Sequence, residues 1–161
     1  MIELLDSASE SLWCVAIVGI AVIAYLVYRV RRPATGPTQA RRYAPAPQGG
    51  PQPRERWWAD FPHQDDPSQS KARPCYVLGY SGRGYWVLKS TTQAPKNPEW
   101  RVPVNAARWS PPADKNGYVD LVPYHLPRGL LKRRQGVLSG TKTAREIESR
   151  VRWDRAWDFI G

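Results

Sequence analysis

The stretch YWVLKSTTQ, residues 85–93, begins with the alternation of a strand and ends in four polar residues, Ser90–Gln93. Serine and threonine at a strand end commonly bond to the nearby backbone, which is one interpretation of this run. The other is that the strand delivers hydroxyl and amide groups to a binding site. The rest of the sequence helps to distinguish a plain strand end from a binding site.

Tryptophan and basic side chains are interleaved through the same half of the chain. The tryptophans are Trp57, Trp58, Trp86, Trp100 and Trp109, and the cations are Arg73, Arg83, Lys89, Lys96, Arg101 and Arg108. Aromatic faces stack unpaired bases and cations hold phosphates, so this mixture is typical of single-stranded nucleic-acid binding. The net charge of +10 fits nucleic acid or an anionic membrane surface as the partner.

Several kinds of enzyme site are excluded by their motifs. GYSGRG, residues 79–84, has Arg83 where a nucleophile elbow requires its second glycine, so it predicts a hairpin turn. No phosphate-binding or dinucleotide-binding glycine motif is present. Two histidines and the separated Cys14 and Cys75 predict neither a zinc site nor an internal disulfide, and no metal or other cofactor is expected.

The residues from 55 onward predict a mainly β domain with an α-helix at its end. Short apolar runs broken by Gly, Pro, Asn and Asp favour a small closed or half-closed barrel. The expected strands are residues 56–61, 75–80, 85–91, 100–104 and 117–126, and residues 129–138 hold a basic turn and a short strand. Alternation in the first strand places Trp57 and Trp58 on opposite faces, so at most one is buried.

A C-terminal helix is expected to start at a capping box, Thr143 to Glu146, with Ile147 and Val151 on one face. The tail WDRAWDFIG follows it. We expect its aromatic side chains to fold back on the barrel, with contact to a membrane surface as the alternative.

An apolar stretch near the start predicts a transmembrane helix. Residues 12–28, LWCVAIVGIAVIAYLVY, contain no charge and would rise on the order of 25 Å as a helix, near the thickness of a bilayer core. The preceding residues 1–11 are acidic, unlike the start of a signal peptide, and Arg29, Arg31 and Arg32 follow the stretch. The positive-inside rule then predicts a single-pass protein of the cytoplasmic membrane, with its N-terminus outside and its C-terminal domain in the cytoplasm.

The chain therefore divides into four parts. They are the acidic N-terminus (1–11), the transmembrane helix (12–28), a basic, proline-rich linker (29–54) and the barrel domain (55–161). The linker lacks large aliphatic side chains and is expected to be extended.

The order of these motifs resembles the MazF/PemK family of toxin endoribonucleases. The resemblance covers about residues 55–151 and rests on RWWADF, ARPCYVL, YWVLKSTTQ and WRVPV, followed by a Gly-Val-Leu segment and a helix. Its most specific elements are Arg73-Pro74 at the start of the second strand and Thr91-Thr92-Gln93 at the end of the third. The resemblance implies a small SH3-like barrel that binds single-stranded RNA.

The same resemblance implies site residues and a reaction. Arg73 and Thr91 would line a catalytic groove for metal-independent cleavage, in which the ribose 2′-hydroxyl attacks the adjacent phosphate and leaves a cyclic phosphate. Arg73 would bind the phosphate, Thr91 would position it, and His63 is our candidate for the proton carrier. The expected RNA-binding residues are Ser90, Thr92, Gln93, Lys89, Arg83, Trp86 and Arg101. His125 is expected to be structural.

The sequence also departs from the family. A membrane anchor and linker are unusual there, RWWADF replaces the family's glycine-acid start, and residues 112–117 form an insert. The alternative is therefore a catalytically inactive barrel that binds a protein or lipid at the inner membrane face, and a structural membrane protein with an unrelated barrel is a third interpretation. Partners implied by the resemblance are a second copy of the chain and an antitoxin or other protein.

Overall fold

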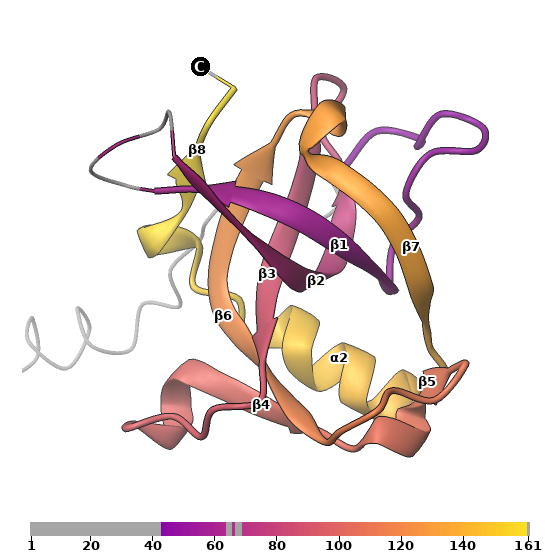
Figure 1. Ribbon diagram of the computed structural model, residues 1–161, viewed down its shortest axis with the longest axis vertical. Coiled ribbons are helices and arrows are strands. Elements are labelled where there is room, and N and C mark those ends of the chain that lie inside the picture. Colours follow the sequence, from indigo (N-terminus) through magenta and orange to yellow (C-terminus); the bar gives the residue numbers. More distant parts are fainter. Residues whose placement is uncertain (1–42, 64–65, 67–68, 161) are drawn as a thin grey trace, which may run out of the picture. The chain divides into compact units, whose positions relative to one another are not determined.

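The computed structural model describes residues 43–63, 66 and 69–160. Most of them belong to a strongly curved sheet with one short α-helix (Figure 1). The elements are β1 (Glu55–Pro62), β2 (Ser70–Tyr80), β3 (Tyr85–Thr91), β4 (Arg101–Val104), β5 (Trp109–Ser110), β6 (Gly117–Leu126), β7 (Leu131–Leu138), α2 (Thr141–Ser149) and β8 (Trp157–Asp158). The prediction of a mainly β domain with an α-helix is confirmed.

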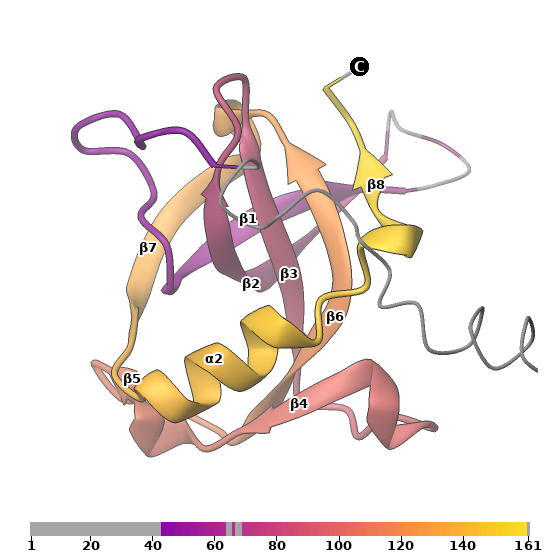
Figure 2. The ribbon, with the colours of Figure 1, turned by 180° about the vertical axis from the view of Figure 1, so that it is seen from behind.

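The strands form one sheet in the order β4-β6-β3-β2-β1-β7-β5. Neighbours along this path are antiparallel, and β8 adds to β6 in parallel. Figures 1 and 2 show the sheet curling into a half-barrel, with α2 lying across one end of it.

Buried side chains gather in two clusters because residues along each strand alternate between faces. Tyr76 and Leu88 belong to the cluster that α2 completes with Ala144 and Ile147. Val87, the next residue along β3, belongs to the second cluster. In β1, likewise, Trp57 is buried and Trp58 is half-buried, which confirms the prediction for this pair.

Several element boundaries differ from the sequence predictions. β2 begins at Ser70, so Arg73-Pro74 lies inside the strand and not at its start. Residues 131–138 form the full strand β7 in place of a turn and a short strand, because β1 pairs with them along most of its length. The short strand β5 was not predicted, since two residues give no periodicity.

The predicted capping box is wrong. α2 begins at Thr141 after Gly140, which offers no side-chain cap, and ends at Ser149. Thr143 is therefore inside the first turn, and Val151 lies beyond the helix. Ala144 and Ile147 form the buried face.

Residues ahead of β1 contact the half-barrel. The amide of Ala44 donates to the carbonyl of Tyr80 at 2.6 Å, and that of Arg54 donates to Val77 at 2.8 Å. The Arg54 side chain also pairs with Glu148 of α2 at 3.0 Å. Contacts of the folded domain thus include residues that the sequence assigns to the linker.

Glu55 joins three segments at the start of β1. Its carboxylate accepts the amide of Gln52 at 2.9 Å and the indole N–H of Trp57 at 2.8 Å, and it pairs with Arg134 of β7. Burial alone would raise the pKa of Glu55, but these three partners outweigh burial and lower it.

The C-terminal tail folds back in part. Trp153 meets Trp86 edge to face at 5.2 Å, and Phe159 stacks on Tyr124 at 6.4 Å. Trp157 stays 40% exposed. Farther along, Ile160 packs against Gly84, where an added Cβ would also lie 2.6 Å from the carbonyl oxygen of Leu126.

Among the described residues, no helix has the length and apolar character needed to cross a membrane. The predicted transmembrane helix, residues 12–28, lies outside the described residues.

Candidate nucleic-acid interface

A fork opens where β2 and β3 part. The two strands are paired as far as Cys75 and Lys89, and β2 then continues beside β1 alone. Ser90 and Thr91, at the end of β3, remain paired with β6. A gap in the sheet therefore separates the end of β3 (Ser90 and Thr91) from the part of β2 that precedes Cys75 in sequence, Ser70 to Pro74.

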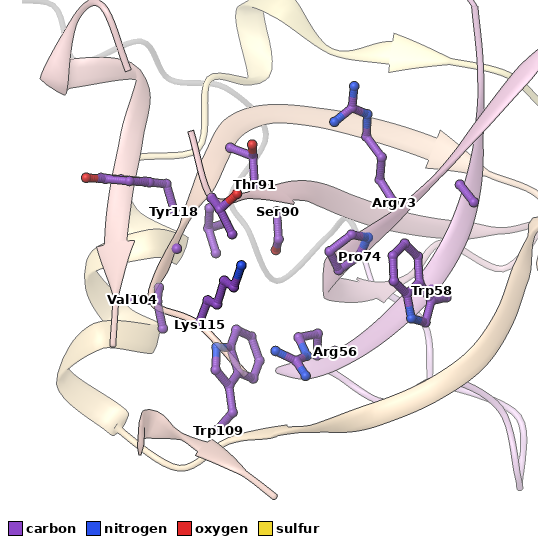
Figure 3. A pocket seen from close by; sticks show the side chains of 14 residues that line it. Arg56, Trp58, Arg73, Pro74, Ser90, Thr91, Val104, Trp109, Lys115 and Tyr118 are labelled. Atoms are coloured by element: carbon purple, nitrogen blue, oxygen red, sulfur yellow. The ribbon is translucent and has the colours of Figure 1, made fainter. Parts of the chain in front are cut away.

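A pocket of about 330 Å³ lies at this fork (Figure 3). Its walls come from β1, β2, β3, β4 and β6, from Thr92 after β3, and from the segment between β4 and β6. The chemically distinctive lining residues are the cations Arg56, Arg73 and Lys115, the aromatics Trp58, Trp109 and Tyr118, and the hydroxyls Ser90, Thr91 and Thr92. No aspartate or glutamate is among the described residues that line it.

The lining residues divide between two sides of the sheet. Figure 3 shows the side chains of Arg73 and Thr91 projecting to one side, while Ser90 projects to the other, where Arg56, Trp109 and Lys115 lie. This follows from alternation along β3, since consecutive residues point to opposite faces. The pocket thus offers hydroxyl and cationic groups on both sides of the fork.

Two buried polar atoms of the pocket have no hydrogen-bond partner among the described residues. They are Oγ of Ser90 and Nε of Arg56. The Arg56 guanidinium lies 5.2 Å from the centre of the Trp109 ring, and burial lowers its pKa while Asp114 acts to raise it. Buried polar groups are nearly always satisfied, so this pair is suited to a ligand that presents acceptor atoms.

Thr91 fits both interpretations of its polar run. Its Oγ1 accepts the backbone N–H of Gln93 at 3.2 Å, as expected of a strand-end threonine. The hydroxyl proton is not used by that bond, so Thr91 can still donate to a ligand.

Arg73 forms no ion pair with a residue that the structure describes. It pairs through its backbone with Ala59 of β1, which fixes its place at the fork. Its guanidinium is therefore available to an anion from outside the domain.

Three of the predicted RNA-binding residues, Lys89, Gln93 and Arg101, lie outside this pocket. Lys89, two residues before Thr91, holds its Nζ 3.9 Å from the centre of the Tyr124 ring. The carbonyl oxygen of Gln93 accepts a hydrogen bond from Arg101 at 2.9 Å, and Arg101 also pairs with Asp120 at 3.6 Å. None of the three predicted residues Lys89, Gln93 and Arg101 is among the pocket's lining residues.

Other predicted residues lie elsewhere. Arg83 lies in the turn between β2 and β3, and Trp86, near the start of β3, stacks on His125 at 4.4 Å. His63, the proposed proton carrier, follows β1, is exposed, and does not line the pocket.

His125 is buried and held at both ring nitrogens. Its Nε2 lies 2.6 Å from Oγ of Ser81, and its Nδ1 lies 2.9 Å from Asp158 of β8. Its contacts join the β2–β3 hairpin to the C-terminal tail, as expected of a structural histidine.

Sequence reasoning missed three lining residues with relevant chemistry, Arg56, Lys115 and Tyr118, and named Trp58 and Trp109 only as part of the general aromatic and basic mixture. Alternation in RWWADF could have placed Arg56 and Trp58 on one face. Trp109 and Lys115 come from a two-residue strand and a loop, for which the sequence carries no periodic signal.

Among the described residues, no three His, Cys, Asp or Glu side chains gather to hold a metal ion. Burial raises the pKa of the Cys75 thiol to about 12, so it is a poor nucleophile.

The fold and site together define a strand-rich domain with a basic, aromatic pocket. No protein-family model matches the sequence, and no curated protein matches it either. Its function has to be argued from the pocket itself.

Proposed function

We propose that the half-barrel is an SH3-like, MazF/PemK-like domain that binds single-stranded RNA at the fork and cleaves it without a metal ion. One observation carries the proposal. Arg73, Ser90, Thr91 and Thr92, which the sequence nominated from separate strands, line one pocket.

The composition of the pocket supports a nucleic-acid ligand. Arg56, Arg73 and Lys115 supply positive charge without an acidic lining residue to oppose them. The half-buried Trp58 supplies a ring face on which an unpaired base can stack, whereas Trp109 is buried in the core and its ring carries the Arg56 guanidinium. Phosphates bind the cations, and a base and its phosphate together match the mixed lining better than a free anion does.

The proposed reaction uses the RNA's own nucleophile. The 2′-hydroxyl oxygen attacks the adjacent phosphorus and the bond to the 5′-oxygen breaks, which leaves a 2′,3′-cyclic phosphate and a 5′-hydroxyl. Charge builds on the phosphate oxygens in the transition state, where the planar fork of Arg73 can stabilise it and the Thr91 hydroxyl can donate a hydrogen bond.

The test is a cleavage assay with the full chain, purified with mild detergent and EDTA present. We expect discrete cleavage of a long unstructured RNA and products that mass spectrometry identifies as cyclic phosphates. Arg73→Ala and Thr91→Ala should each slow cleavage by about 10²–10³-fold, as for the loss of one transition-state donor.

Matched controls use exposed positions of α2 outside the pocket, Arg145→Ala and Thr141→Ala. They should cleave at the parent rate. Intact RNA at high protein concentration, or equal loss in the control variants, contradicts the proposal.

We propose for the chain the membrane placement that its sequence predicts. Residues 12–28 anchor it in the cytoplasmic membrane, the N-terminus is outside, and the domain faces cytoplasmic RNA. A second copy and an antitoxin-like protein are its proposed partners. A reporter fused after Gly161 should behave as cytoplasmic, and an external signal would remove access to that RNA.

A second candidate function is an interaction module at the inner membrane face. The observation in its favour is the exposed Trp100, whose ring centre lies 6.0 Å from the guanidinium of Arg152 and 5.6 Å from that of Arg155. Trp157, two residues after Arg155, is also exposed. Indole and guanidinium groups suit lipid headgroups. This function stands if the full chain neither binds nor cleaves RNA.

A further inference from the structure

The proposed cleavage lacks a proton carrier in the pocket. Proton transfer at the leaving oxygen requires a group that titrates near neutral pH. No histidine, cysteine, aspartate or glutamate is among the described lining residues, and His125 is held by Ser81 and Asp158. His63 lies beyond the end of β1, whose Ala59 is the residue paired with Arg73. A different side chain has to do this step.

Lys89 does not line the pocket, but it lies on the face of the sheet that carries Arg73 and Thr91. It pairs with Cys75 across β2 and β3, and Arg73 and Thr91 are each two residues further toward the fork on these strands. Residues two apart on a strand share a face, so the three side chains project together. Figure 3 shows Arg73 and Thr91 projecting to the same side.

The ammonium group of Lys89 is held in place by two rings. Its Nζ lies 3.9 Å from the centre of the Tyr124 ring and 4.9 Å from that of Phe61. No ion pair fixes it to a described acid. A lysine that is oriented in this way, with its protons not engaged by a carboxylate, is suited to transfer one.

Building on the proposed function, we propose that Lys89 is the general acid that protonates the 5′-oxygen as it leaves. The 2′-hydroxyl gives its proton to solvent, and its oxygen forms the new bond to phosphorus. The bond from phosphorus to the 5′-oxygen breaks, and Lys89 gives one ammonium proton to that oxygen. The neutral amine then takes a proton from solvent.

The charges around Lys89 favour this role. Burial and the neighbouring Arg73 of β2 lower its pKa, Asp120 of β6 opposes them, and the result is about 8. Phe61 of β1 and Tyr124 of β6 contribute rings and no ionised group at neutral pH. Lys89 is therefore mostly protonated at pH 7 yet a much stronger acid than an ordinary lysine.

The decisive experiment compares two RNA substrates of one sequence with the full chain. One has the ordinary linkage at the mapped cleavage position, and the other has sulfur in place of the 5′-oxygen. Sulfur leaves without protonation, so an acid is needed only for the oxygen substrate. Lys89→Gln should slow cleavage of the oxygen linkage by about 10²-fold or more and that of the sulfur linkage by only a few fold.

Lys115→Gln is the matched control, because it removes a cation from the pocket lining without removing the acid. It should slow both substrates equally. Lys89→Arg keeps the charge over the rings but cannot donate readily, so it should share the defect of Lys89→Gln on the oxygen linkage.

The pH dependence adds a second measurement. The ratio of oxygen-linked to sulfur-linked cleavage rates should be constant below pH about 8 and fall about tenfold for each further pH unit in the parent. Equal slowing of both substrates by Lys89→Gln, or full activity of Lys89→Arg, would overturn the role of Lys89 and leave the proposed function intact. A parent chain that cleaves neither RNA would overturn both.

Discussion

Salt dependence of RNA binding gives a quantitative test of the pocket. The cations Arg56, Arg73 and Lys115 line it, and each phosphate contact to single-stranded RNA lowers the slope of log K against log salt by about 0.7. Three such contacts predict a slope of about −2, so affinity should fall roughly 18-fold between 50 and 200 mM salt. Steeper dependence would mean that cations outside the pocket also bind phosphate.

Removal of one pocket cation should change the slope by a fixed amount. Lys115→Gln leaves two contacts, so we expect a slope of about −1.4 and a loss of roughly sevenfold over the same salt range. Lys142→Gln removes an exposed lysine of α2 that does not line the pocket. Its slope should equal that of the parent.

The assay is fluorescence anisotropy with a labelled, unstructured RNA whose 2′-hydroxyls are methylated, because this RNA binds but cannot be cleaved. Lys115→Gln and Lys142→Gln are titrated beside the parent at four or more salt concentrations. An equal change in both variants would refute binding at the pocket and indicate only a diffuse attraction between the basic domain and RNA. A slope near zero would refute phosphate contacts altogether.

Two stability predictions follow from contacts outside the pocket. Glu55→Ala should destabilise the domain by about 2 kcal/mol and lower Tm by roughly 6–10 °C, because it leaves a buried indole N–H and an arginine without their acceptor. Since the pKa of Glu55 is lowered on folding, its contribution is present above the ordinary glutamate pKa and should disappear as pH falls through the folded value. Thermal melts at several pH values test this, with the exposed Glu146→Ala expected to stay within about 0.5 kcal/mol of the parent. Gly84→Ala should cost about 1–3 kcal/mol in the same assay because its Cβ would press on Ile160 and on backbone. Gly129→Ala, where a Cβ meets nothing within 4 Å, should be close to neutral, and equal melting points for the two glycine variants would contradict the packing argument.

The elements that the sequence predicted well are those with strong periodicity. The strand at residues 85–91 has the predicted bounds, because Tyr85, Val87 and Leu88 supply buried side chains to the two clusters. The strand at 117–126 is also continuous, although Pro123 has no backbone N–H to donate to a neighbouring strand. Burial of their apolar side chains dominates local irregularities in both cases.

The predictions that failed depend on partners distant in sequence. Residues 131–138 read as basic and turn-like, with Lys132, Arg133 and Arg134 in succession, and become a strand because β1 pairs with them. The capping box at Thr143 failed because the helix starts earlier, with Gly140 at the N-cap position in place of Thr143, and Ala144 and Ile147 of this helix reach the core. The local sequence pattern does not reveal contacts with β1 or with the core, because these lie far away in sequence.

The site residues on regular strands were predicted, and those on irregular segments were not. Arg73 and the hydroxyls of residues 90–92 lie at strand positions, whose faces and neighbours follow from alternation and pairing. Lys115 and Trp109 enter the pocket from irregular segments, whose course no periodic signal reveals. His63 was proposed mainly because histidine titrates near neutral pH. It lies outside the predicted strands, so no strand pairing could indicate where its side chain lies.

The Arg-Pro pair has a physical role in forming the pocket that its residue types alone do not suggest. Pro74 has no backbone N–H, and it is the first residue of β2 beyond the pairing with β3, which ends at Cys75 and Lys89. A strand that cannot donate at this point is free to part from its neighbour while it stays beside β1, where Pro74 pairs with Trp58. Arg73, one residue further, then lines the gap and has no neighbouring acid of β3 to pair with. The proline thus helps to open the fork, and the arginine beside it supplies the charge there, so the two residues act as one unit.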